Sequence, residues 1–232
     1  MPRSRVHVAA AAALVLSVPS LAAAIPITGT SSGVFLNPLP VTAVTTGVGT
    51  SSFTFGTPAA GSAAGSLDFV GLPFGTDTET DFQIGTLTYH NGTLAVGTEA
   101  TSVDLQVGLT FTTPPVGTEA FTFGLSIINT INDPSDPDAS ADFLILPVGF
   151  SSSVFMFGGT AYTLEILGFR NVVGDGFLTS SDTQFHVREE LSASAELWGR
   201  VTADIPGAIP EPGTLLLLGS GLLASFWRRR RA

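Results

Sequence analysis

The chain has 232 residues, with no cysteine, 9 basic residues and 19 acidic residues. Without cysteine it can form no disulfide framework, no thiolate zinc site and no cysteine nucleophile. Residues 25–210 hold 18 of the acidic residues and three arginines, a net charge of −15, so the body offers little to neutralise the phosphates of a nucleic acid. Hydrophobic residues make up 44% of the chain, which excludes a wholly disordered protein.

Residues 1–24 have the pattern of a secretory signal peptide. Arg3 and Arg5 form the charged start, and an apolar stretch follows. Ala22 and Ala24 put small residues at both positions that a signal peptidase needs, so we expect cleavage after Ala24. The alternative is an uncleaved membrane anchor, but the apolar stretch is shorter than the roughly 20 residues that span a bilayer.

Residues 25–65 are rich in Ser, Thr, Gly and Ala. Such a composition is typical of a flexible leader. Hydrophobic triplets at 34–36 and 53–55 interrupt it, so we expect short edge strands joined by loose links.

Residues 66–208 are predicted to form a β-sandwich body. Apolar and polar residues alternate strictly over 103–112, which indicates a strand with one buried face. The segment 82–89 leads into Asn91-Gly92, the preferred pair for a tight hairpin turn. Further strands are expected at 121–127, 143–146, 154–157, 162–166, 185–187 and 195–201. Roughly ten short strands with glycine turns predict an all-β fold, an antiparallel sandwich of jelly-roll type.

The densest polar cluster is the segment 129–142. Calcium takes six to eight oxygen ligands, and an Asp-rich loop can supply them. We therefore treat as candidate calcium ligands Asp133, Asp136, Asp138 and Asp142. The loop lacks the spacing of an EF-hand. The alternative is a solvated connection, because Asp, Asn, Pro and Ser are the usual turn residues.

No catalytic motif is assembled along the chain. After signal removal only His90 and His186 remain as histidines, and no Gly-x-Ser-x-Gly elbow occurs before the tail. The carboxylate pair of a glycoside hydrolase would be spatial, and so it stays open at this point. We expect a protein that is not an enzyme and that needs no cofactor except, as a candidate, calcium.

The last 24 residues, 209–232, have three parts. A Pro-Glu-Pro-Gly segment comes first, at Pro210, Glu211, Pro212 and Gly213. An uncharged run follows at 214–227, which as a helix would span roughly 21 Å, short of the roughly 30 Å hydrocarbon core. The chain closes on Arg228, Arg229, Arg230 and Arg231, which should stay cytoplasmic. A plain C-terminal anchor would share these properties.

This tail resembles the PEP-CTERM protein-sorting signal in its motif, its apolar run and its arginine cluster. The resemblance implies that exosortase, an integral-membrane cysteine protease, recognises and processes the tail. It also implies a Gram-negative bacterium that makes exopolysaccharide.

The body resembles the choice-of-anchor K domain over residues 30–200. The segments that carry this resemblance are 53–56, 82–92, the strand ending at Phe111, 141–143 and 162–169. That family has no established activity to carry over, and its members reach the surface by different anchors.

Together these observations predict an exported protein that is held in the inner membrane until exosortase acts, and that then becomes a structural component of the exopolysaccharide or biofilm matrix. Its expected partners are signal peptidase, exosortase, the inner membrane transiently and exopolysaccharide, and not nucleic acid. The alternatives are a calcium-dependent carbohydrate-binding module and a secreted glycoside hydrolase. A carbohydrate-binding module would place exposed Trp198 or Tyr162 beside the Asp-rich loop.

Overall fold

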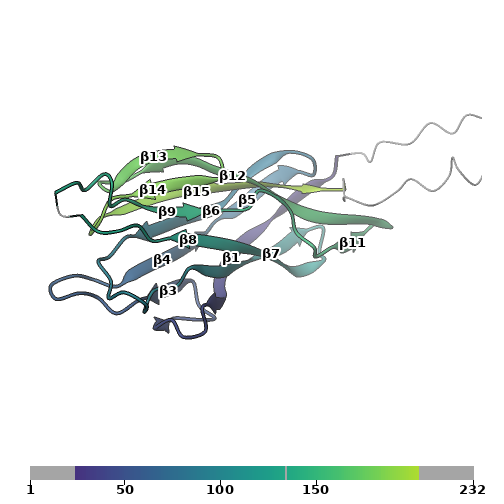
Figure 1. Ribbon diagram of the computed structural model, residues 1–232. Helices are drawn as coiled ribbons and strands as arrows, with labels where there is room; N and C mark the ends of the chain where they lie inside the picture. The colour runs from purple at the N-terminus through teal and green to yellow at the C-terminus, as the bar shows by residue number, and fades with distance from the viewer. Residues whose placement is uncertain (1–23, 134, 204–232) are drawn as a thin grey trace, which may run out of the picture. The chain divides into compact units, whose positions relative to one another are not determined.

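The fold is a pair of facing β-sheets, seen in a computed structural model that describes residues 24–133 and 135–203 (Figure 1). One sheet has seven strands in the order β13-β14-β9-β8-β7-β1-β5. The other has eight strands. Seven of them follow the order β10-β12-β15-β6-β4-β3-β2, and the eighth, β11, pairs with β12 outside this order. Every strand pairing is antiparallel. The predicted antiparallel sandwich is therefore confirmed.

The strands of the seven-stranded sheet are β1 (Pro26–Leu39), β5 (Pro73–Asp77), β7 (Ser102–Thr113), β8 (Gly117–Ile128), β9 (Asp142–Ile145), β13 (Phe177–Ser181) and β14 (Gln184–Val187). The remaining strands are β2 (Thr45–Thr46), β3 (Ser52–Phe55), β4 (Gly65–Gly71), β6 (Asp81–His90), β10 (Gly149–Phe150), β11 (Phe155–Phe157), β12 (Thr160–Val173) and β15 (Ser192–Thr202). No α-helix occurs among the described residues.

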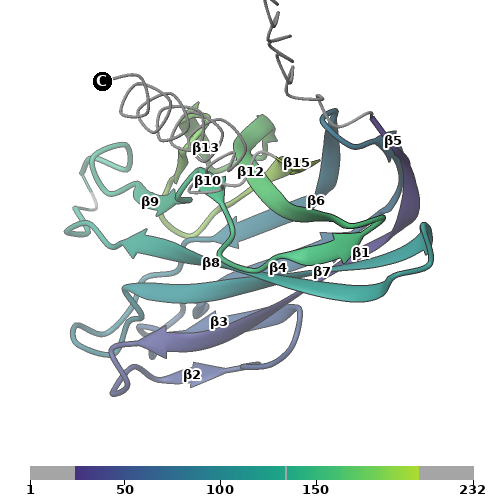
Figure 2. The same ribbon diagram turned by 90° about the vertical axis from the view of Figure 1, so that its right-hand side faces the viewer.

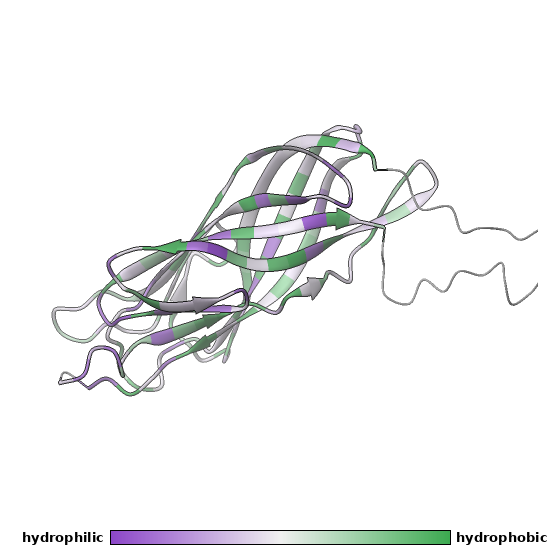
Figure 3. Cartoon of the chain, turned by 90° about the horizontal axis from the view of Figure 1, so that it is seen from above, coloured by the Kyte–Doolittle hydropathy of each residue, from purple (hydrophilic) through white to green (hydrophobic). Residues whose placement is uncertain are grey.

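Alternation of apolar and polar residues decides which face of each strand is buried. In β7, Val103, Leu105 and Val107 are fully buried, whereas the residues between them are partly exposed. Successive side chains of a strand point to opposite faces, so one face of β7 packs in the core and the other meets solvent. Figure 3 shows the same alternation of hydrophobic and hydrophilic residues along neighbouring strands.

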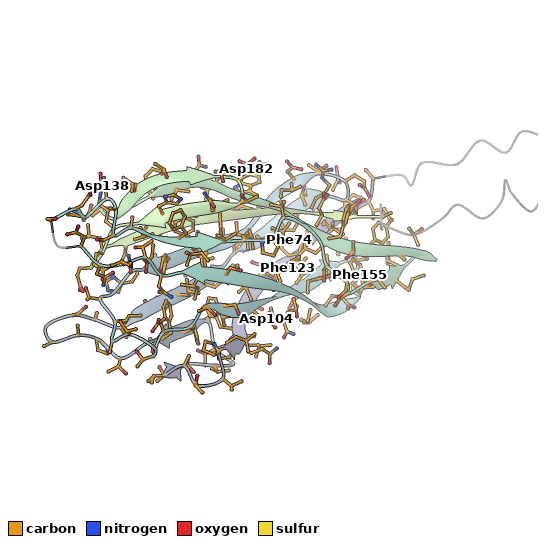
Figure 4. All side chains as sticks on the ribbon, viewed as in Figure 1. Phe74, Asp104, Phe123, Asp138, Phe155 and Asp182 are labelled. Carbon is orange, nitrogen blue, oxygen red and sulfur yellow. The ribbon has the colours of Figure 1, made fainter. Side chains whose placement is uncertain are left out.

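Aromatic side chains fill the space between the sheets. The ring of Phe74 lies 5.7 Å from that of Phe111, which in turn lies 5.2 Å from Phe155. Figure 4 labels Phe74 and Phe155 in this interior, together with Phe123, and places Asp182 at its periphery. Rings at these separations pack favourably beyond the apolar area that they bury.

Residues 25–65 do not form the predicted leader. Strand β1 is 14 residues long and lies between β5 and β7 inside the seven-stranded sheet. Its residues Ile27 and Phe35 belong to the core. Only β2 and β3 fit the expectation of edge strands, because β2 ends the eight-stranded sheet and β3 is its neighbour. The leader prediction was wrong for β1, since pairing on both sides compensates for its small residues.

The pair Asn91-Gly92 does not form the predicted hairpin. Strand β6 ends at His90, and the chain then crosses to β7 in the other sheet. Asn91 is 1% exposed and its Nδ2 donates to the Val187 carbonyl at 2.9 Å. A Cβ on Gly92 would overlap the carbonyl oxygen of Ala63. This pair therefore holds neighbouring segments together at close approach, where only a short polar residue and a glycine fit.

Asn91→Ala is expected to destabilise the protein by about 1–3 kcal/mol, because it leaves the buried Val187 carbonyl without its donor. Urea unfolding of the variant beside the wild type measures the loss. Asn132→Ala is the control, because Asn132 donates its hydrogen bond at the surface. A loss at Asn91 no larger than that at Asn132 would contradict this role.

Candidate functional site

Both ends of the described chain meet at one end of the sandwich, which we call the terminal end. The amide of Ile25 donates to Thr78 Oγ1 at 2.9 Å, and the amide of Ala203 donates to Glu79 Oε1 at 2.7 Å. Figure 2 looks toward this end, where β1 and β5 lie side by side. The turn between β5 and β6 thus ties together the places where the chain enters and leaves the body.

The opposite end, which we call the tip, is built from the segments 56–64, 91–101, 129–141 and 188–191. Backbone hydrogen bonds join them, among them Ala59 N to Thr93 O at 2.8 Å and Asn91 N to Leu191 O at 3.0 Å. Every one of these segments connects strands at the end away from Ile25 and Ala203. The tip therefore lies at the end of the body opposite Ile25 and Ala203.

Three of the four candidate calcium ligands lie in the tip segment 129–141 and Asp142 follows it directly, but the four do not converge. Asp133 accepts from the amide of Ser135 at 2.9 Å, and Asp136 accepts from the amide of Ala139 at 3.0 Å. Asp138, labelled at the left of Figure 4, forms an ion pair with Arg188. Asp142 is 4% exposed. In residues 24–133 and 135–203 no three His, Cys, Asp or Glu side chains are grouped to hold a metal ion.

Asp142 lies beneath the loop instead, at the start of β9. Its Oδ1 accepts from the amide of Thr130 at 2.6 Å and from the Thr130 hydroxyl at 3.0 Å. The hydroxyl of buried Tyr89 donates to Oδ2 at 3.4 Å. Loss of hydration raises the pKa of Asp142 to about 6, and the nearby charge of Glu189 adds to the rise, against the hydrogen bonds from Thr130. Asp142 therefore anchors the loop and holds a proton more readily than an exposed carboxyl.

Two further contacts fasten the loop to the segment 188–191. Asn132 Nδ2 donates to Glu189 Oε1 at 2.8 Å, and Arg188 pairs with Asp138. The second oxygen of Glu189, Oε2, is buried and has no hydrogen-bond partner within the described part of the chain, and burial raises the pKa of this carboxyl. The loop is thus positioned by side chains from three separate segments.

A cleft of about 500 Å³, the tip cleft, opens between the segments 92–99 and 129–132. Two acidic residues, Asp142 and Glu99, are among those that line it. Among the hydrophobic residues at its edge, Val96 is 98% exposed and Ile131 is 90% exposed. A concave site that combines apolar walls with a few polar groups is what a small polar ligand requires.

Tyr89, Glu99 and Glu189 were not predicted as site residues. They come from β6 and from two connecting segments that are distant in the sequence. No spacing along the chain marks them, because only the crossing between the sheets brings them to the tip. Asp142 was singled out, but as a calcium ligand and not as an anchor.

The aromatic residues expected of a carbohydrate-binding module are elsewhere. Tyr162 is 2% exposed and packs with Phe155 in the core. Trp198 lies on β15, with the Arg170 guanidinium 4.5 Å from the centre of its ring. Neither residue lies beside the Asp-rich loop, so the arrangement that would favour that module is not formed.

Several predicted features lie outside the described residues. They are residues 1–23 of the signal peptide with Ala22 among them, the sorting segment Pro210–Gly213, the apolar run 214–227 and the cluster Arg228–Arg231. Ala24 is the first described residue and is exposed, whereas Ile25 already bonds to Thr78. Within the described part of the chain, no helix is long and apolar enough to cross a membrane.

Comparison with known families identifies the tail. Residues 208–231 match the family described as the PEP-CTERM protein-sorting motif. No curated protein matches the chain. The match supports a protein that exosortase sorts to the cell envelope, the surface or the exterior, as the tail predicts.

Proposed function

We propose that this protein is a non-enzymatic structural component of an exopolysaccharide or biofilm matrix. Signal peptidase removes residues 1–24, and the precursor stays in the inner membrane with its arginine cluster on the cytoplasmic side. Exosortase then processes the tail, and the body is released or attached outside. A body of the choice-of-anchor K type suits this role, because such domains are displayed by interchangeable anchors.

The observation that carries the proposal is the position of the sorting motif relative to the fold. The motif begins at residue 208, so four residues, 204–207, separate it from Ala203 at the terminal end. Glu79 receives hydrogen bonds from the Thr202 hydroxyl and the Ala203 amide, both at 2.7 Å. The chain therefore leaves the body toward the sorting motif at the terminal end, which is the end opposite the tip.

Charge supports a matrix role. With 18 acidic residues against three arginines, residues 25–210 have a net charge of −15. Two of the three arginines, Arg200 and Arg170, pair with Asp81 and hold the pKa of that carboxyl below its usual range. Such a body repels copies of itself and stays soluble.

The intact mass of the protein, measured separately from host membranes and from the medium, tests the proposal. We expect a form outside the inner membrane that begins at Ile25 and ends near Pro210 or Pro212. Glu211→Ala should leave a longer form in the membrane, whereas Glu119→Ala on β8 serves as a charge-matched control. A full-length wild-type protein that remains in the membrane would overturn sorting.

Absence of catalysis is tested on the host exopolysaccharide. We expect no increase in reducing ends over days of incubation with the protein. Hydrolysis that disappears in Glu99→Gln would instead favour the glycoside hydrolase. Calcium binding stays a prediction, and a calorimetric titration compared between wild type and Asp138→Asn decides it.

A further inference from the structure

The tip cleft is the strongest unassigned feature of the body, and an inference from it rests on the proposed surface function. Its volume of about 500 Å³ lies within the roughly 300–1,000 Å³ range of small-molecule sites. It also opens at the end away from the attachment, where a partner in the matrix has access. Its lining indicates which chemistry that partner carries.

The amide side chains of the cleft are oriented so that they can accept hydrogen bonds. Asn129 Nδ2 donates to the Ala100 carbonyl at 3.3 Å, and Asn132 Nδ2 donates to Glu189 Oε1 at 2.8 Å. Both residues line the cleft, and these bonds leave their carbonyl oxygens to accept. A ligand that fits here supplies hydrogen-bond donors.

Glu99 adds a second, independent observation. Glu99 is one of the residues that line the cleft, and one oxygen of its carboxylate, Oε2, is buried with no hydrogen-bond partner among the described residues. A buried carboxylate oxygen without a donor costs free energy, which a ligand carrying a charged donor would recover. The nearest arginine in the tip segments, Arg188, already pairs with Asp138 and donates to the Phe177 carbonyl. No arginine of the tip segments is therefore left to pair with Glu99, and a ligand would have to supply the positive charge.

The hydrophobic side chains at the edge of the cleft favour a sugar over a simple amine. Leu94, Val96 and Ile131 line it, and Val96 and Ile131 are almost completely exposed. A sugar ring has an apolar C–H face that covers such side chains, together with hydroxyl groups that reach the acceptors. A short aliphatic diamine offers no hydroxyl groups to the amide oxygens.

We propose that the tip cleft binds a sugar residue that carries a free amino group, in its ammonium form. The ammonium group donates to Glu99, the hydroxyl groups donate to Asn129 and Asn132, and the C–H face packs on Val96 and Ile131. A chain of amino sugars in the matrix would then be held at the tip while the terminal end stays with the anchor.

Titration of the protein purified from the host, from whichever fraction contains it, tests the ligand. The probes are a glucosamine oligosaccharide with free amines, its N-acetylated counterpart and 1,5-diaminopentane. We expect the glucosamine oligosaccharide to bind at least about tenfold more tightly than either of the others, because each lacks one of the two required interactions. If the acetylated sugar binds equally well, the cleft does not require an ammonium group. If the diamine binds equally well, the cleft does not require a sugar ring. Either result overturns the proposal.

Variants place the binding in the cleft. Glu99→Gln removes the unpartnered charge, and Val96→Lys adds a repelling charge at a position 98% exposed, where folding is not at risk. Each should weaken glucosamine binding by about tenfold or more. The controls are Asp182→Asn, an exposed carboxylate away from the cleft, and Val41→Lys, an exposed valine in another loop. Equal loss in the controls, or none in the cleft variants, overturns the site.

The same preparations separate this inference from the proposed function. If the intact masses show normal processing and glucosamine does not bind, the cleft assignment is wrong and the sorting stands. If the protein remains full-length in the membrane and glucosamine binds, the cleft assignment stands and the matrix role is wrong.

Discussion

Phe35→Ala is expected to lower the free energy of unfolding by about 3–5 kcal/mol. Phe35 is fully buried on β1, and its ring lies 5.9 Å from that of Phe53 on the opposite sheet. Truncation removes apolar contacts from both sheets and leaves a cavity between them. Urea unfolding of the exported protein, followed by the fluorescence of Trp198, measures the loss.

Val41→Ala is the matched control for this prediction. Val41 lies two residues after the end of β1 and is 88% exposed, so its truncation should change stability by less than about 0.5 kcal/mol. If residues 25–65 were a loose leader, Phe35 would behave like Val41. Equal, small effects at the two positions would therefore restore the leader interpretation and contradict the central place of β1.

Strands that carry their own alternation could be predicted from the sequence. The segment 103–112 became β7, and the segments 121–127 and 195–201 became the central parts of β8 and β15. In each of them apolar residues occupy every second position, so the sequence itself shows which face is buried. The fold class follows from such strands, because several short alternating strands can be buried only as layers.

Strand β1 could not be predicted in this way, because the segments that pack against it leave room only for small residues such as Gly and Ser. A Cβ on Gly33 would overlap the ring of Phe69 from the facing sheet. The hydroxyl of Ser31 donates to the carbonyls of Leu72 and Ile84. Composition alone makes such a segment look like a linker, although close packing between the sheets is what selects its Gly and Ser residues.

The candidate site shows the same limit. Asp142 was identified because it belongs to an Asp-rich segment, but its role depends on Tyr89 of β6 and on Thr130. Glu99 and the pair Glu189-Glu190 lie far from the loop in the sequence and come close to it only in the folded body. A site made of single residues from several connections leaves no spacing to detect.

Asp142→Asn is expected to remove most of the decrease in stability that the wild type shows between about pH 4 and pH 6. The folded-state pKa of Asp142 is about 6, against an ordinary value of 3.8. The native state therefore binds this proton more tightly than the unfolded chain does, and stability falls as pH rises through that window. The shift corresponds to a change of about 2–3 kcal/mol. Urea unfolding of both proteins at closely spaced pH values measures it.

Other carboxyls also change their protonation on folding, and they limit the pH range in which this comparison reports Asp142. The pKa of Glu189 is also raised by burial, so Glu189→Gln removes a contribution of the same sign. The pKa of Asp81 is lowered by Arg200 and Arg170, so its contribution is lost only as pH falls below its ordinary value. Above about pH 4 the divergence between the wild type and Asp142→Asn should therefore come from Asp142 and from its charge interaction with Glu189. If both lose stability in parallel up to pH 6, Asp142 holds no proton there, and the anchor of the loop is a charged carboxylate.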